Sequence, residues 1–299
     1  MASTTHLATP EDDRRHAPGP ESLPLWNESL WFPFYDPARE IGVVFRVGML
    51  PNQGRANLFV FLVHRGAIVH ALVDQHAPVP PADPGQLELG GLRIDWEVPL
   101  ERFRLRYRNG THGFDVRWEA TSPAYRYPHP PGVSFDQVPG HLEQGGRARG
   151  TVLLGGTAHT VDAFAHRDHS WGGERDWAKF HRWTYLSGEL DDGSWFNAVR
   201  IDYGAEVDFR IGCLWDGREL LDLARIDLEV ATVDGGARQR GVTARLTDER
   251  GGTHEIVGEA PVAICPVRYG QTWLKDGFTR WRWGAREGWG IHEHGYVEG

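Results

Sequence analysis

The chain has 299 residues and a formal net charge of −9, and 40% of its residues are hydrophobic. The negative charge and the lack of a basic cluster argue against nucleic acids and anionic membrane surfaces as partners. No apolar run reaches the roughly 18 residues that a transmembrane segment needs, so the composition is that of a packed soluble protein.

The first 22 residues, MASTTHLATPEDDRRHAPGPES, contain no apolar core of the kind that signal peptides have. Because they cannot bury enough apolar surface to fold, they are predicted to be a disordered leader. A cytoplasmic location is therefore expected. Cys213 and Cys265 lie in apolar stretches and are predicted to be buried thiols rather than a disulfide.

Alternation of apolar and polar residues dominates the rest of the chain. Residues 102–108 and 114–120 alternate without a break and are joined by an Asn-Gly turn, which predicts a β-hairpin. Helical spacing is almost absent, so less than about 15% helix is expected. The same pattern of alternating pairs around short turns recurs at 57–63 with 67–73, 151–154 with 157–165, 180–190 with 194–203, 206–215 with 219–230, 241–249 with 253–260, and within 278–297.

Many strands without helices must close into barrels or stack as sandwiches to hide their edges. The predicted fold class is therefore all-β, with two consecutive antiparallel β-barrel or sandwich units. Residues 121–146 are rich in Pro and Gly and break the alternation, which indicates the linker between the units. The expected boundaries are a disordered leader at 1–22, an N-terminal unit at 23–130, a linker at 131–146 and a C-terminal unit at 147–299.

The stretch AHRDHSWGGERDW, residues 165–177, concentrates more proton-transfer groups than any other part of the chain. An Asp that stays protonated in an apolar pocket, or that orients a His, is a general acid, so Asp168 and His169 are the predicted catalytic pair. Neighbouring residues face opposite ways on a strand, and the pair converges only if the chain bends, which Gly172 and Gly173 permit. Residues expected to hold this loop in place are His166, Arg167, Arg175 and Asp176.

The pattern Asp-His-x-Trp-Gly, present as DHSWG at residues 168–172, resembles the signature of the carotenoid 1,2-hydratase (hydroxyneurosporene synthase) superfamily. The longer form RDHSWG, with NESLWFPFYDP at 27–37 and GWGIHEHGYVEG at 288–299, resembles an uncharacterised, mostly actinobacterial group assigned to it. The resemblance implies two consecutive lipocalin-like β units. It also implies protonation, hydration, isomerisation or cyclisation of apolar polyene or prenyl substrates without metal or organic cofactor, with Asp168 and His169 at the active site.

Protonation of an alkene makes a carbocation, and an aromatic face stabilises a cation by about 0.5–2 kcal/mol. A pocket with aromatic walls is therefore expected around the acid. Glu28 and Glu293 are candidate second acids if their side chains face the pocket. Otherwise Glu28 is expected to be a cap or surface residue and Glu293 a solvated residue. The candidate wall residues are Trp31, Phe32, Phe34 and Tyr35 in the first unit and Trp171, Trp183 and Tyr185 in the second.

Three other interpretations stay open. The cluster could be a structural loop clamped by Asp–Arg pairs. It could be a metal site of His166, Asp168 and His169 with His292 and His294, although adjacent ligands fit poorly, so no metal is expected. The chain could also be a lipocalin-like carrier of a hydrophobic molecule. The favoured function is a cofactor-independent lyase, isomerase or cyclase acting on an apolar, terpenoid-like small molecule; the sequence does not define the oligomeric state.

Overall fold

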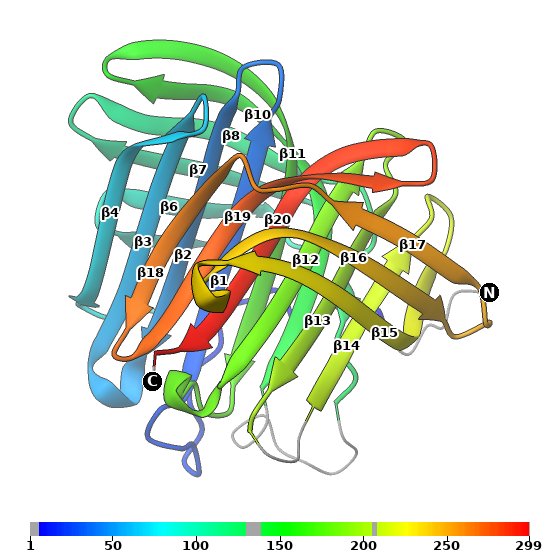
Figure 1. Ribbon diagram of the computed structural model, residues 1–299. Coiled ribbons are helices and arrows are strands. Elements are labelled where there is room, and N and C mark those ends of the chain that lie inside the picture. The colour runs from blue at the N-terminus through cyan, green and yellow to red at the C-terminus, as the bar shows by residue number, and fades with distance from the viewer. Residues whose placement is uncertain (1–5, 130–138, 205–207, 299) are drawn as a thin grey trace. The chain divides into compact units, whose positions relative to one another are not determined.

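The computed structural model describes residues 6–129, 139–204 and 208–298, which form strands joined by short turns (Figure 1). The described residues contain no α-helix, so the all-β prediction is confirmed. They divide into two compact units, one within Thr5–Arg175 and the other within Asp176–Gly299. No helix in these ranges is long and apolar enough to cross a membrane.

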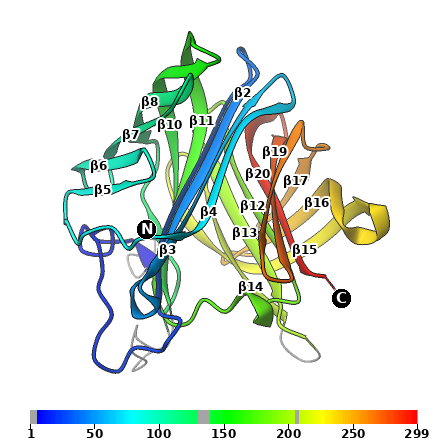
Figure 2. The same ribbon diagram turned by 90° about the vertical axis from the view of Figure 1, so that its left-hand side faces the viewer.

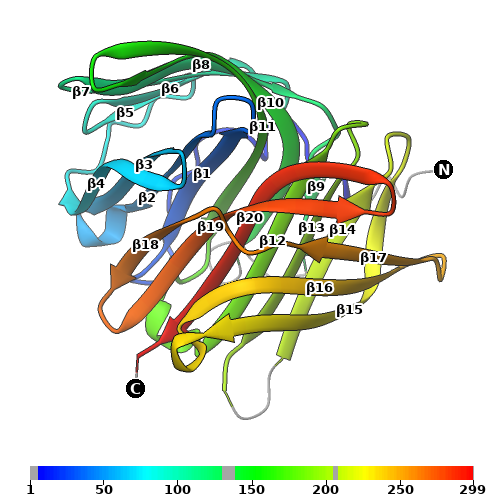
Figure 3. The ribbon, with the colours of Figure 1, turned by 45° about the horizontal axis from the view of Figure 1, so that its top comes forward.

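The N-terminal unit is one antiparallel sheet in the order β4-β3-β2-β1-β11-β10-β8-β7-β6-β5, with β9 paired to β10 (Figure 2). The sheet curls on itself (Figure 3). Its end strands are not hydrogen-bonded to each other, but Gly90 beside β5 packs against Leu58 and Leu72 of β3 and β4. The barrel is therefore nearly closed. Its strands are β1 Asn27–Asp36, β2 Ile41–Leu50, β3 Arg55–His64, β4 Ala67–Ala77, β5 Gln86–Leu89, β6 Leu92–Val98, β7 Arg102–Asn109, β8 His112–Ala120, β9 Tyr125–Arg126, β10 Gly140–Leu154 and β11 Thr157–Gly172, with a 3₁₀ turn η2 at Pro51–Gln53.

The C-terminal unit is an antiparallel sheet in the order β17-β16-β15-β14-β13-β12-β20-β19-β18. An additional pairing of β17 with β19 closes eight of these strands into a barrel, which leaves β18 outside the ring. Its strands are β12 Arg182–Leu190, β13 Trp195–Asp202, β14 Asp208–Trp215, β15 Leu220–Val233, β16 Arg238–Asp248, β17 Thr253–Gly258, β18 Ala263–Tyr269, β19 Thr272–Trp283 and β20 Arg286–Val297, with 3₁₀ turns η3 Trp177–Lys179 and η4 Asp234–Gly236.

Side-chain alternation fills each barrel with its own core. In β11, Val161, Ala163 and Ala165 belong to the N-terminal core, so the odd-numbered positions of this strand face inward. In β1 the even positions Leu30 and Phe32 do so. The C-terminal barrel has a separate core that includes Leu186, Phe196 and Trp281. Cys213 and Cys265 are both buried thiols that form no disulfide with each other, as predicted.

The unit boundaries differ from those expected. Strands β10 and β11 pair with β8 and β1, so residues 140–172 belong to the N-terminal unit and the boundary follows Arg175. The expected linker at 131–146 overlaps β10 from Gly140 onward; residues 130–138 lie outside the described residues. The motif cluster therefore lies in the first unit rather than the second, because a Gly-rich strand resembles a linker by composition alone.

The expected disordered leader also differs. Residues 1–5 lie outside the described residues, but the segment that follows packs on the N-terminal unit. Leu7 forms a β-bridge with Tyr125, and Trp96 donates its indole N–H to the carbonyl of Asp13 at 2.7 Å. The Asp13 side chain is fully buried. Charged residues of this segment thus find partners inside the barrel, which the composition could not show.

Candidate acid–base site on strand β11

The motif residues of β11 alternate between two sides of the sheet. Arg167 and His169 continue the inward-facing row that begins with Val161, whereas His166, Asp168 and Ser170 point to the outer face. No bend brings Asp168 and His169 together, because β11 runs unbroken to Gly172. The expected Asp168–His169 pair therefore does not form, and the motif contributes to two different clusters.

On the outer face, Asp168 is the register partner of Trp31 on β1 and of Glu143 on β10. Trp31 in turn faces Arg46 on β2. Directly opposed residues in an antiparallel sheet have neighbouring side chains. Asp168 therefore has a buried indole on one side and a buried carboxylate on the other. Of the predicted wall residues, Trp31 is the one that lies beside it.

Asp168 forms no hydrogen bond or ion pair through its side chain within the described part of the chain. Burial raises its pKa to about 7, and the charge of Glu143 acts in the same direction. His141, Arg46 and Arg175 oppose this shift. A carboxyl group that keeps its proton near neutral pH can act as a general acid.

Glu143, by contrast, is surrounded by donors. Burial alone would raise its pKa, but His141 and His166 overcome this effect and hold the pKa well below the usual range. His141 Nε2 lies 2.7 Å from one carboxylate oxygen and His166 Nε2 lies 2.6 Å from the other. The hydroxyl of Tyr127 donates to the same carboxylate at 3.3 Å. Glu143 is therefore the ionised member of the Glu143–Asp168 pair.

His141 connects this carboxylate to the motif. Its Nδ1 lies 2.6 Å from Ser170 Oγ, and the two residues are register partners on β10 and β11. The side chain of His141 is 16% exposed, whereas Ser170 and Glu143 are buried. Ser170, His141 and Glu143 thus form a continuous hydrogen-bonded row beside Asp168.

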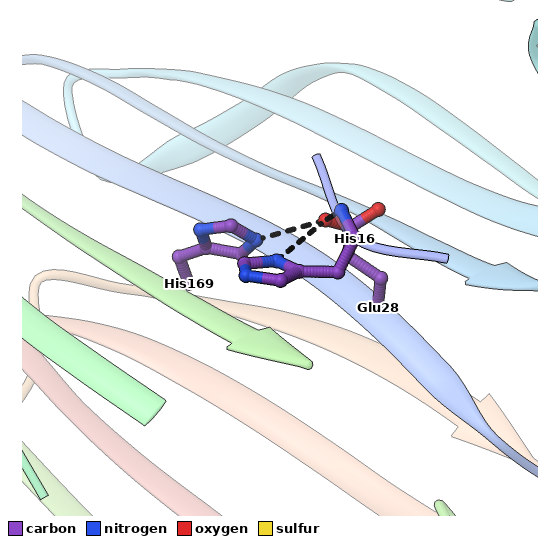
Figure 4. Close-up of side chains that lie close together, drawn as sticks. All are labelled: His16, Glu28 and His169. Atoms are coloured by element: carbon purple, nitrogen blue, oxygen red, sulfur yellow. Dashed lines mark hydrogen bonds and ion pairs between the residues drawn. The ribbon is translucent and has the colours of Figure 1, made fainter. Parts of the chain in front are cut away.

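On the inner face, Glu28 of β1 joins the other half of the motif to the N-terminal segment (Figure 4). His169 Nε2 lies 3.1 Å and His16 Nδ1 3.3 Å from the same Glu28 oxygen, and Arg15 donates to the other oxygen at 2.8 Å. Despite its burial, hydrogen bonds from the two histidines lower the pKa of Glu28 to about 2. Glu28 is therefore a buried, charge-paired carboxylate rather than a proton donor.

Arg167 anchors the same segment. Its guanidinium is fully buried, donates to Asp13 at 2.6 Å and binds Gln144 through two nitrogens. It also lies over the Phe103 ring at 4.5 Å. Arg167 was expected to hold the motif loop in place; it instead holds the N-terminal segment inside the barrel, on the side opposite Asp168.

The remaining wall candidates of this unit are dispersed. Trp171 faces the inner cluster and stacks on His16 with ring centroids 4.4 Å apart. Phe32 and Phe34 lie in the barrel core. Tyr35 is on the outer face with Trp31 but four residues along the strand, roughly 13 Å away. Of the four aromatic candidates from β1, only Trp31 adjoins Asp168.

In the C-terminal unit, Tyr185 and Glu293 are register partners, and Trp183 donates its indole N–H to Glu293. These three predicted residues therefore share one face of β12 and β20, opposite the face that carries His292.

Asp176 accepts a hydrogen bond from the Ala178 amide at 3.1 Å and caps η3. It thus positions the loop through a cap rather than through an ion pair with Arg167. Arg175 donates its backbone N–H to the carbonyl of Leu25 at 2.9 Å.

Two sets of side chains have the ligand types for a metal ion, namely His16, Glu28 and His169, and His141, Glu143 and Asp168. In the first, Arg15 already neutralises Glu28. In the second, two histidines already satisfy Glu143. The metal set considered from sequence does not assemble, because His166 and Asp168 lie on the face opposite His169.

Four residues of these clusters were not among the candidates predicted from the sequence, namely His141, Glu143, Asp13 and His16. His141 and Glu143 lie in the Gly-rich segment that the composition predicts to be a linker. Their spacing of two, which places both on one face of a strand, is a signal that could have identified them.

A family model described as Domain of unknown function (DUF7064) matches residues 9–297. The chain belongs to this family. The match covers the N-terminal segment from Thr9 onward together with both barrels, so the packed segment is part of the family domain. No curated protein matches the sequence significantly.

Several solved structures have folds similar to that of this chain. A protein assigned as AttH from Nitrosomonas europaea is similar with a TM-score of 0.70 and 15% identity, covering 100% of this chain and 99% of that one. Kievitone hydratase from Nectria haematococca has a TM-score of 0.68 and 12% identity, covering 99% and 95%. CghA in complex with Sch210972 has a TM-score of 0.65 and 10% identity, covering 100% and 98%. These similarities establish the double lipocalin-like fold; the carotenoid hydratase resemblance stays a prediction.

Proposed function

We propose that this protein is a cofactor-independent enzyme that protonates an apolar small molecule and so hydrates, dehydrates, isomerises or cyclises it. The observation that carries the proposal is the opposed pair of carboxyl groups on the outer face of β10 and β11. The pKa of Asp168 is raised and that of Glu143 is lowered. Two carboxyl groups whose environments drive their pKa values apart are the usual arrangement of an acid and its partner base.

Asp168 is the proposed proton donor. The Trp31 indole beside it offers an aromatic face to a cation that forms on protonation, worth about 0.5–2 kcal/mol. His169 has no part in this step, because it binds Glu28 on the inner face. The shared fold with kievitone hydratase and with CghA supports the general class of reaction by analogy alone.

A carrier of hydrophobic molecules is the other function considered. Such a carrier needs aromatic walls, but it has no use for a protonated carboxyl group set directly against an ionised one. The arrangement of Asp168 and Glu143 therefore favours the enzyme.

The test uses isotopes, because they report protonation even without net product. The purified protein is incubated in D₂O with a panel of prenylated phenols and acyclic terpene alcohols, and mass spectrometry follows deuterium gain and the addition or loss of water. Turnover or deuterium incorporation by wild type that Asp168→Asn abolishes supports the proposal. Binding of panel members with no exchange or turnover would support the carrier instead.

A further inference from the structure

The row Ser170–His141–Glu143 has the geometry of a base, and it lies on the same face as Asp168. Resting on the proposed function, we propose that Ser170, His141 and Glu143 form the general base that removes a proton while Asp168 supplies one. Hydration, dehydration and cyclisation through a cation all need both operations at different atoms of the reactants.

The hydrogen bonds define the direction of proton flow. Glu143 is ionised and accepts the Nε2 proton of His141 across 2.7 Å, which fixes the tautomer of the ring. His141 Nδ1 is then free of a proton and accepts from Ser170 Oγ–H across 2.6 Å. His166 binds the second oxygen of Glu143 at 2.6 Å and so holds the carboxylate in place. A hydroxyl group whose proton can pass to an oriented imidazole can in turn take a proton from water.

A serine–histidine–carboxylate row is also the arrangement of acyl-transfer enzymes, but Ser170 is unsuited to that role. It lies in the interior of β11, where its register partners are Ser29 on one side and His141 on the other. Backbone amides of a central strand are used in the ladder, whereas acyl transfer needs free N–H donors aimed at the oxyanion. The row is therefore assigned to proton removal.

In the hydration direction the steps balance without a co-reactant. The Asp168 carboxyl gives its proton to one alkene carbon, which leaves a carbocation and a carboxylate. Water forms a C–O bond to the cation, its proton passes to Ser170 Oγ, and the hydroxyl proton of Ser170 passes to His141. The imidazolium beside Glu143 then returns a proton to Asp168 through solvent, so the net change is the addition of one water molecule.

Acid and base are close enough to be coupled. One ligand-type atom from each of His141, Glu143 and Asp168 lies within 4.8 Å of the others. The charge of His141 lowers the pKa of Asp168, and that of Glu143 raises it. The titratable and charged groups around Asp168 in this unit are His141 and Glu143 on β10, His166 on β11, Arg46 on β2, Tyr127 before β10 and Arg175 after β11.

The first experiment needs no substrate. The protein is labelled with [¹³Cγ]aspartate, and the Asp168 resonance, assigned by its loss in Asp168→Asn, is titrated by NMR. Glu143→Gln should lower the titration midpoint of Asp168 because a neighbouring negative charge is gone. His141→Gln should change it as well, because the charge of a protonated His141 lowers the pKa of Asp168. If neither variant moves the midpoint, the groups are not coupled and the proposed base is wrong.

The second experiment tests the base itself with whichever prenylated phenol shows turnover. His141→Ala should slow turnover by about 10²–10⁴-fold, the usual worth of general base catalysis, and added imidazole should restore part of the rate. The matched control is His254→Ala, which removes a comparable His–carboxylate pair, 2.7 Å from Asp248, in the C-terminal unit. Its rate should be unchanged and insensitive to imidazole.

The outcomes separate the two proposals. Wild-type rates in His141→Ala, or a folded but slow variant that imidazole does not rescue, would reject the base while leaving Asp168 as the acid. If wild type neither exchanges deuterium nor turns over any panel member, the proposed function fails and the base assignment fails with it, whatever the NMR titration shows about coupling.

Discussion

Glu143 and Asp168 oppose each other directly across β10 and β11, and their pKa values are shifted in opposite directions. The difference arises from their partners, because both carboxyl groups are desolvated. Two histidines and a tyrosine donate to Glu143, whereas the Asp168 side chain has no hydrogen-bond donor among the described residues. This asymmetry favours the protonated form of Asp168 and the charged form of Glu143.

Replacing Asp168 by Asn should remove the acid while preserving the shape of the side chain. We expect turnover of the isotope-assay substrate to fall by about 10²–10⁴-fold, with binding largely unchanged. Steady-state kinetics and calorimetric binding measure the two effects. Asp162→Asn on the same strand is the matched control, since Asp162 is exposed and pairs with Arg147 on the surface. Equal losses in both variants would contradict the acid role.

The rate should depend on pH through the protonation of Asp168. Because its pKa is raised to about 7 and only the protonated form donates, kcat should decline as the pH rises through about 7. A pH–rate profile at fixed ionic strength measures this limb. In Glu143→Gln the limb should move to lower pH, since removing the neighbouring charge makes Asp168 more acidic. A rate that stays constant from pH 6 to about 9 would be inconsistent with the assignment.

The free energy of unfolding should also depend on pH through the protonation of Asp168. Between the ordinary Asp pKa of 3.8 and about 7, the folded state binds the Asp168 proton more tightly than the unfolded state does. The contribution of this group to the free energy of unfolding is therefore full below pH 3.8 and is lost as the pH rises through about 7. Urea denaturation of wild type and Asp168→Asn across this range tests this: the difference between their free energies of unfolding should change with pH. A difference that stays constant would assign the pH dependence to other groups.

The buried pair of Arg167 and Asp13 should be among the strongest contributors to stability in the N-terminal unit. Asp13→Asn leaves the fully buried guanidinium without its counter-charge, which typically costs about 3–5 kcal/mol. Arg147→Met, which removes a pair with the solvent-exposed carboxylate of Asp162, should cost less than about 1 kcal/mol. Chemical denaturation compares the two. Similar small losses would mean that the N-terminal segment is not anchored by this pair.

His169 should behave as a structural residue. His169→Gln removes a contact to Glu28 in the inner cluster, and we expect a loss of about 1–3 kcal/mol in the free energy of unfolding. The titration midpoint of Asp168 should not change in this variant, because His169 lies on the other side of the sheet. Titration of [¹³Cγ]aspartate and denaturation of the same variant check both parts. A displaced Asp168 midpoint would restore His169 as a catalytic partner.

Most strands and hairpins of this protein can be predicted from patterns between residues that are close together in the sequence. The alternation in stretches such as RFRLRYR and FDVRWEA, with an Asn-Gly turn between them, determines β7 and β8, and similar hairpins account for most of the other strands. The burial of Cys213 and Cys265 as thiols also followed from their apolar surroundings. These features depend on residues close together in the chain, so local periodicity is sufficient to predict them.

The site depended on pairings between distant segments. The sequence predicted Asp168 and Trp31 as candidates, and the structure places them side by side. Alternation on an unbroken strand separates Asp168 from His169, however, and the strand register brings Glu143 from 25 positions earlier to face Asp168. The same folding carries Asp13 to Arg167 across 154 positions and so anchors the segment from residue 6 onward on the N-terminal unit, where a disordered leader was expected. A charged residue read alone appears solvated; only tertiary structure supplies the distant partner that makes its burial favourable.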